Sequence, residues 1–183
     1  MKRITMTLSY LTLASAVLVG CMTASNPATA EQERAPNDLE IAHIAYTAGN
    51  IDIRYAHLAL AISDNPEVRQ FAELMVRDHT AVNNKALALV DKLQITPQDN
   101  PTSRQLSQRA NEIRNELSQL RGEAFDKRYA GNELEYHKFV NNAVENAFIP
   151  NAKNAELKSL LTAALQTFKV HESHAASMNQ QVM

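Results

Sequence analysis

The sequence predicts an all-α fold, and two observations support this prediction. Beyond residue 37 the chain is rich in Ala, Leu, Gln, Glu and Arg, and its only glycines are Gly49, Gly122 and Gly131. Residues that favour helices therefore dominate. In addition, no segment of this region alternates apolar and polar residues with the period of two that a half-buried strand requires.

Turn residues and helix caps divide this region into five helices. Asn65 is a natural N-cap, and Pro66 suits the first position of the helix that follows. The segment 96–101 holds two prolines and predicts a loop, while Gly122 and Pro150 mark two further joints. We therefore expect helices at 38–63, 66–94, 102–120, 122–149 and 153–181.

The lengths of the connections predict how these helices are arranged. Short turns join the first two helices and the last two, whereas the middle connection is long and holds a helix of its own. Two antiparallel pairs joined by one long crossover is the connectivity of a ferritin-like four-helix bundle. An up-and-down bundle with a fifth helix folded against it is the alternative. We expect residues 38–183 to form one domain that needs no disulfide.

Residues 1–20 combine a basic start with an apolar run. Lys2 and Arg3 precede the run from residue 4 to residue 19, which is too short to be a comfortable membrane span and is typical of a secretory signal. The Leu-Val-Gly at its end stands directly before Cys21, the only cysteine, and this ending resembles the lipobox of bacterial lipoproteins. We expect Cys21 to become the acylated first residue of the mature chain. A plain secretory signal is the alternative.

Residues 21–37 are expected to form a flexible tether, because they are small, polar and interrupted by Pro27 and Pro36. Acyl chains on Cys21 would make the contact with the membrane, and several are needed for stable anchoring. Met22 rather than an aspartate follows the cysteine. By resemblance to lipoprotein sorting in two-membrane bacteria, this favours the outer membrane. We therefore expect a protein of the bacterial cell envelope that faces the periplasm.

The charge of the mature chain excludes one class of partner. The chain has 18 basic and 20 acidic residues, and loss of Lys2 and Arg3 with the leader leaves 16 basic ones, a formal charge of −4. A mildly acidic domain without a basic stripe is a poor nucleic-acid binder. We therefore expect no nucleic-acid partner, while the sequence defines neither a protein partner nor an oligomeric state.

Two histidines lie on the apolar seams of their helices. In the helix that starts at residue 66, apolar residues recur at alternating spacings of three and four, as a bundle core requires, and His79 falls in that series. His171 has the same position in the last helix. In the helix from residue 122, either Tyr136 or His137 takes the inward place, and in the first helix Asp52 flanks the seam.

Counting from the first turn places these side chains near one level of the bundle. Asp52 and His79 are both about thirteen residues from that turn, and the other two histidines lie within about 8 Å along the axis at 1.5 Å per residue. One carboxylate with up to three imidazoles is a donor set that divalent transition metals favour. The candidate metal ligands are therefore Asp52, His79, His137 and His171. The alternative is structural, with buried histidines hydrogen-bonded to a partner such as Asp78 or Asp126.

A catalytic di-iron centre of the ferritin type is not expected. Such centres need a Glu-x-x-His motif on each of two helices and a glutamate on each of the others. The residues three positions before the candidate histidines are Val76, Leu134 and Phe168, and only Glu40 with His43 forms the motif. We therefore expect no enzymatic activity.

Several short motifs of the chain resemble those of the bacterial "domain of unknown function 4142" family. They are Gly49-Asn50-Ile51-Asp52, Asn65-Pro66-Glu67-Val68, Phe71-Ala72, Met75-Val76-Arg77-Asp78-His79-Thr80, Phe125-Asp126-Lys127-Arg128-Tyr129, His137, Glu156-Leu157-Lys158 and His171. The resemblance covers roughly residues 38–178 and implies a ferritin-like fold, a place in the bacterial envelope and no established activity. The family more often has Glu where this chain has Asp52, and the shorter carboxylate reaches less far toward a ligand.

Together these observations predict a lipid-anchored envelope protein that is not an enzyme and that binds a partner or supports stress tolerance. The alternative is a bundle that holds a divalent transition metal, such as copper, zinc or iron, through the four candidate ligands. The alternative predicts metal-dependent melting, because a ligand bound only by the folded state raises stability.

Overall fold

The computed structural model describes residues 34–183, so the expected leader, Cys21 and most of the tether lie outside the described residues. The described part is helical and holds no strand, which confirms the all-α prediction. Its elements are α2 (Asp38–Ile62), α3 (Pro66–Leu93), α4 (Pro101–Ser118), α5 (Gly122–Ala143), the π-helix η1 (Val144–Phe148), α6 (Ile149–Asn151) and α7 (Ala155–Val182). Among residues 34–183, no helix combines the length and the apolar character needed to cross a membrane.

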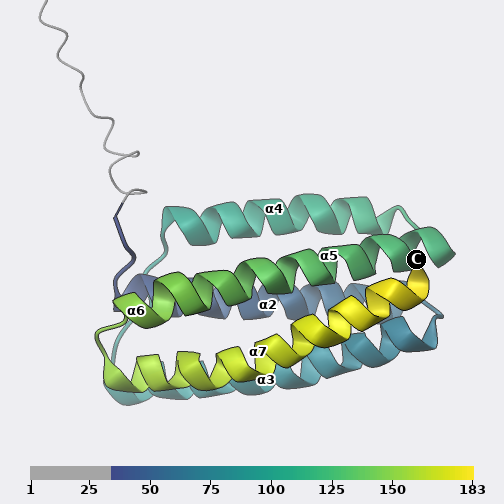
Figure 1. The fold of residues 1–183 in the computed structure, drawn as a ribbon. Coiled ribbons are helices and arrows are strands. Elements are labelled where there is room, and N and C mark those ends of the chain that lie inside the picture. Colours follow the sequence, from purple (N-terminus) through teal and green to yellow (C-terminus); the bar gives the residue numbers. More distant parts are fainter. Residues whose placement is uncertain (1–33) are drawn as a thin grey trace, which may run out of the picture.

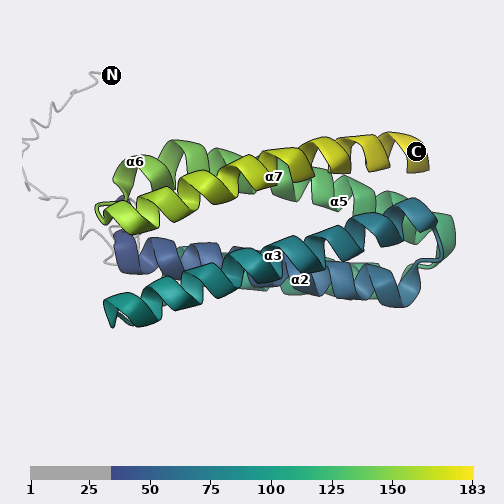
Figure 2. The same cartoon turned by 90° about the horizontal axis from the view of Figure 1, so that it is seen from below.

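Four long helices form the bundle, in two antiparallel pairs. Helix α2 packs on α3, and α5 packs on α7; Figure 2 shows the two pairs as separate layers. Helix α4 packs against α2 outside the four and returns the chain to the end of the bundle where α5 begins (Figure 1). As a result, α3 and α5 run in the same direction. This is the connectivity predicted for a ferritin-like bundle with a helical crossover.

Asparagines cap the starts of α2, α3, α4 and α7. Asn65, for example, accepts the backbone N–H of Glu67 at 2.9 Å. At the start of α7, the carboxylate of Asp38 accepts the backbone N–H groups of Lys153 and Asn154, each at 2.8 Å. These bonds satisfy donors that would otherwise lack partners at helix starts. They also hold the first turns of α2 and α7 together.

The chain departs from the predicted helix ends near Pro150. The sequence predicts one continuous helix from 122 to 149, whereas the α-helix ends at Ala143 and continues through the π turn η1 into α6. Proline lacks an N–H, and its ring clashes with the carbonyl four residues earlier in a regular α-helix. A wider π turn accommodates this change. The last helix begins at Ala155 rather than 153, because Asn154 is its N-cap.

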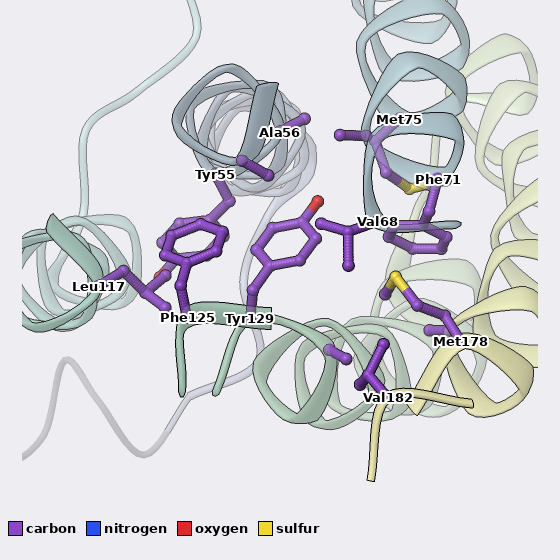
Figure 3. Packing of buried hydrophobic residues seen from close by; sticks show 14 of the residues in the cluster. Tyr55, Ala56, Val68, Phe71, Met75, Leu117, Phe125, Tyr129, Met178 and Val182 are labelled. Carbon is purple, nitrogen blue, oxygen red and sulfur yellow. The ribbon is translucent and has the colours of Figure 1, made fainter. Parts of the chain in front are cut away.

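Apolar side chains fill two clusters at opposite ends of the bundle. The cluster near the α2–α3 turn contains large rings, among them Tyr55, Phe71, Phe125 and Tyr129 (Figure 3). The cluster at the other end, where α6 leads into α7, contains Ile41, Ile44, Val144, Phe148, Ala152, Leu157, Leu161 and Leu165. The polar side chains that form the candidate site lie between these two clusters.

Candidate metal centre

Five ionisable side chains meet in the middle of the bundle, and each helix of the two pairs supplies at least one. Helix α2 supplies Asp52, α3 supplies His79, α5 supplies Glu133 and His137, and α7 supplies His171. All five are buried, Asp52 and Glu133 completely. The structure thus brings together the four candidate ligands predicted from the sequence and adds Glu133.

Asp52 lies at the centre of this group. Its Oδ2 is 3.2 Å from Nε2 of His79 and 3.3 Å from Nε2 of His137. Neither contact has the alignment of a hydrogen bond, and within residues 34–183 neither oxygen of Asp52 has a hydrogen-bond partner. Burial of an uncompensated carboxylate costs free energy. A cation at this point would remove that cost.

The hydrogen bond of His137 fixes which of its nitrogens can bind a metal. Its Nδ1 lies 2.9 Å from the backbone carbonyl oxygen of Glu133, one turn earlier in α5. A carbonyl oxygen only accepts, so Nδ1 carries the proton, and a neutral ring then has its lone pair on Nε2. That lone pair faces Asp52 Oδ2 at 3.3 Å. Two acceptors at this distance attract each other only through a proton or a metal ion between them.

His171 has the opposite tautomer, because its other ring nitrogen donates to an acceptor oxygen. Its Nε2 lies 2.9 Å from Oδ2 of Asp78. The hydrogen bond from Arg77 lowers the pKa of Asp78, so this carboxylate accepts and Nε2 of His171 donates. The lone pair is then on Nδ1, which is buried and has no hydrogen-bond partner in the described part of the chain. Burial also lowers the pKa of His171, which favours the neutral ring.

Neither nitrogen of His79 forms a hydrogen bond with a residue of the described range 34–183. Its ring stacks on Phe168, with centroids 4.8 Å apart and an angle of 6° between the planes. Burial lowers the pKa of His79 to about 4, so the imidazole is neutral near pH 7. The ring centroids of His79 are 5.9 Å from His137 and 5.3 Å from His171, and the latter two are 5.6 Å apart. The three imidazoles therefore form a triangle around one point.

The distances between ligand atoms suit a metal ion with a small adjustment. One nitrogen from each of His79, His137 and His171 lies within 4.8 Å of the others, and the same holds for one atom each of Asp52, Glu133 and His137. Nitrogen binds Zn²⁺ at roughly 2.0–2.1 Å, so donors in a tetrahedral site are about 3.4 Å apart. The imidazoles would move inward by about 1 Å to share one ion.

Glu133 is the functional residue that sequence reasoning missed. Burial and, second, the nearby charge of Asp52 raise the pKa of Glu133 well above its ordinary value, which favours the protonated carboxyl. Its Oε2 lies 3.8 Å from Nδ1 of His137. The available signal was its position four residues before His137, which puts both on one face of α5. The di-iron motif has its glutamate three residues before the histidine, a position that Leu134 occupies here.

Three other sequence expectations are resolved by the contacts. His137 rather than Tyr136 faces the cluster, while the Tyr136 hydroxyl donates to the carbonyl oxygen of Ala48 at 2.9 Å. Asp126 accepts from the Ser63 hydroxyl and does not bond to a histidine. Asp78, the other proposed partner, bonds to His171, as described above.

The single Glu-x-x-His motif does not reach the cluster. Glu40 lies in the first turn of α2, where its carboxylate accepts from the guanidinium of Arg34 and from the backbone N–H of Asn37. It therefore caps a helix and binds the last residues before the bundle. His43 is one turn further along α2, near the same end. It lies about 14 Å from Asp52 along the helix axis at 1.5 Å per residue.

Comparison with known families places the chain in one of them. A family model described as "Domain of unknown function (DUF4142)" matches residues 23–178, which is most of the chain. The chain belongs to this family. Neither the curated proteins nor the solved structures contain a match to it. The DUF4142 description assigns no activity, so the functional argument rests on the buried cluster itself.

Proposed function

We propose that this DUF4142 protein is a metal-binding bundle, in which one divalent transition metal is held by His79, His137, His171 and Asp52. The observation that carries the proposal is the pair of fixed tautomers. Nδ1 of His137 is bonded to the Glu133 carbonyl and Nε2 of His171 to Asp78, and the other nitrogen of each ring is buried without a hydrogen-bond partner among residues 34–183. Metal-bound histidines characteristically have such second bonds, which orient the ring and raise its basicity.

The donor set narrows the choice of metal. Three imidazoles and one carboxylate suit zinc, copper, iron or nickel, whereas magnesium and calcium prefer oxygen ligands alone. A divalent ion would compensate the carboxylate of Asp52, which has no hydrogen-bond partner among residues 34–183. It would also use lone pairs of three buried imidazoles that no N–H group of the described chain engages.

We propose a binding role rather than a catalytic one. Four protein ligands complete a tetrahedral coordination shell, whereas catalytic zinc sites keep one position for water or substrate. For Glu133, a fifth group at the site, burial and the charge of Asp52 raise the pKa and favour the protonated form in the metal-free state. It can lose that proton when a cation enters, which would make metal uptake dependent on pH.

The proposed address is the bacterial envelope, with Cys21 acylated and residues 22–37 as the tether. The support is the Leu-Val-Gly-Cys ending of the leader. Growth with a radiolabelled fatty acid tests this proposal, since label should enter the wild-type chain and not a Cys21→Ser variant. Label in both chains, or in neither, would contradict it.

Thermal melting tests the metal proposal. The chain from residue 21 onward, carrying Cys21→Ser, should melt at a lower temperature after chelation and regain stability when zinc, copper, iron or nickel is added. His171→Ala should abolish this response. His174→Ala is the matched control, because His174 lies one turn further along α7 and is exposed. A melting point that no metal changes would contradict the proposal.

A further inference from the structure

A cavity of about 370 Å³ occupies the interior of the bundle between the two helix pairs. Its walls come mainly from α2, α3, α5 and α7, with Leu106 of α4 and Val144 and Phe148 of η1. Asp52, His79 and His137 form one end. Most side chains between its ends are apolar and many are small: Ala42, Ala45, Ala48, Val82, Ala86, Leu89, Val140, Ala143, Val144, Leu157, Leu161 and Ala164. Tyr46, Asn83 and Tyr136 also line the cavity.

The cavity is elongated along the bundle axis. Its lining on α2 runs from Asp38 to Asp52, a distance of about 21 Å at 1.5 Å per residue. Polar residues lie at both ends of the cavity. Its outer end, at the end of the bundle, holds Asp38, Thr102 and Asn154, and its inner end, in the middle of the bundle, is the candidate metal centre. Thr102 and Phe139 are the exposed residues of the lining, so they mark where the cavity meets solvent.

We propose that this cavity binds one unbranched hydrocarbon chain, namely the tail of a fatty acid or of a membrane lipid. The volume falls within the range of roughly 300–1,000 Å³ that is typical of small-molecule sites. A long and narrow apolar space matches a linear chain, and burial of that chain supplies the driving force. The charged head stays at the opening near Thr102 and Phe139, because its burial among these apolar side chains would cost free energy.

This binding site is independent of the proposed metal function, because it rests on the cavity alone. The chain would lie along α2 with its far end close to Asp52, His79 and His137. A bound tail would exclude water from this side of the candidate metal centre. It would also replace contacts that the apolar walls otherwise lack, since an empty space deprives its lining of dispersion interactions.

Binding of oleate tests the proposal directly. The residues that line the cavity lie between Asp38 and Phe168, so the chain from residue 21 onward with Cys21→Ser contains the complete site. After removal of copurified lipid by organic extraction and refolding, titration with oleate should saturate at one molecule per chain, counted by native mass spectrometry. Parallel incubation with phosphatidylglycerol vesicles and mass analysis of the reisolated protein separates the two sources of the tail. Uptake of oleate alone indicates a free fatty acid, and extraction of phospholipid indicates a lipid tail.

Variants that fill the cavity locate the bound chain. Ala164→Phe and Ala86→Phe project a ring into the cavity from α7 and α3, and each should weaken oleate binding by about tenfold or more. Ala163→Phe and Ala88→Phe are the matched controls, because these alanines are exposed on the same helices and do not line the cavity. Both controls should bind oleate as the parent does.

Three results would overturn the proposal. They are the absence of saturable binding, binding of many oleate molecules per protein chain, and equal oleate affinity in the filled and the control variants. If Ala164→Phe does not fold, Ala86→Phe at the half-buried wall gives the same comparison. All titrations are run with a chelator and again with zinc. Oleate binding in the chelator with no response to metal would support the cavity site and contradict the metal function, and the reverse result would do the opposite.

Discussion

Oδ2 of Asp52 lies 3.3 Å from Nε2 of His137, while the other nitrogen of that ring is committed to the carbonyl oxygen of Glu133. When this ring is neutral, its Nε2 lone pair faces an oxygen of Asp52 in the core. In the absence of a proton between them, this contact is unfavourable. A metal ion at this position converts both groups into ligands, and four predictions follow from this geometry and its surroundings.

The first concerns Asp52→Asn. The amide nitrogen can donate to Nε2 of His137, and the buried charge is removed, so the metal-free variant should gain about 1–2 kcal/mol in the free energy of unfolding. Its metal affinity should fall at least about tenfold, because an amide is a much weaker ligand. Urea unfolding in chelator and calorimetric titration with zinc measure the two effects. Asp64→Asn, at the exposed turn between α2 and α3, is the control and should change neither. A less stable metal-free Asp52→Asn variant would show that the carboxylate is already compensated.

Acidification should destabilise the metal-free protein through His79. Burial lowers the pKa of His79 to about 4 in the folded state, whereas the unfolded value is near 6.5. Between these values the unfolded chain binds a proton that the folded chain does not, so stability is lost as the pH falls from about 6.5 to about 4. The contribution of His79 to stability, measured as the difference between the parent and a His79→Gln variant, should fall by about 2 kcal/mol between pH 7 and pH 5. Urea unfolding at a series of pH values measures it.

A His79→Gln variant should lose less stability than the parent as the pH falls from 7 to 5. The exposed His57 on α2 provides a matched His57→Gln control, which should keep the parent's pH dependence. If His79→Gln retains the full slope between pH 7 and pH 5, other groups cause the acid loss.

The raised pKa of Glu133 predicts the opposite dependence of stability on pH. Burial and the charge of Asp52 raise its pKa, so the folded state keeps a proton that the unfolded state releases above its ordinary pKa near 4.5. The contribution of Glu133 to stability should therefore decline as the pH rises above 4.5, opposite to the contribution of His79. Glu133→Gln should remove this decline and stabilise the metal-free protein at pH 7. Glu135→Gln, exposed on the same helix, should not. Chemical denaturation from pH 5 to pH 9 in chelator tests this prediction, and a Glu133→Gln variant with the parent's slope would contradict it.

Gly49 and Gly131, the two glycines in helix interiors, should differ in their tolerance of alanine. A Cβ on Gly49 would lie 2.4 Å from Oδ1 of the buried Asn83, so this side chain would have to move and lose its 3.3 Å bond to Asn50. Gly49→Ala should therefore lower the melting temperature. Gly131→Ala meets only Oδ1 of Asn179 at 3.8 Å and should gain up to about 1 kcal/mol from helix propensity. Differential scanning calorimetry of both variants makes the comparison. An equal gain in both would mean that Asn83 is free to rearrange.

The fold could be predicted from the sequence because the signals that mark its helix ends are local. Asn65, Asn154 and the segment around Pro97 and Pro101 carry the chemistry of caps and loops, and the connection lengths then restrict the topology. The π turn before Pro150 could not be predicted, because it depends on how α5 is held against α7.

The candidate site was only partly predictable for a similar reason. Apolar spacing identifies the inward positions of His79 and His171, but a glutamate in the core contradicts the ordinary expectation that such residues are exposed. Glu133 is buried because Asp52, His137 and Asn132 surround it from two helices. The cavity depends on the separation of the helix pairs, which the number of alanines in each helix does not define.

Metal content of the purified protein tests the central claim most directly. The chain from residue 21 onward with Cys21→Ser is dialysed against a metal-buffered mixture of zinc, copper, iron and nickel and analysed by elemental mass spectrometry. One equivalent of a transition metal per chain is expected, with loss of that metal in His79→Ala and its retention in His57→Ala. A chain without stoichiometric metal, or one in which both variants retain it equally, would contradict the assignment of the buried cluster as a metal centre.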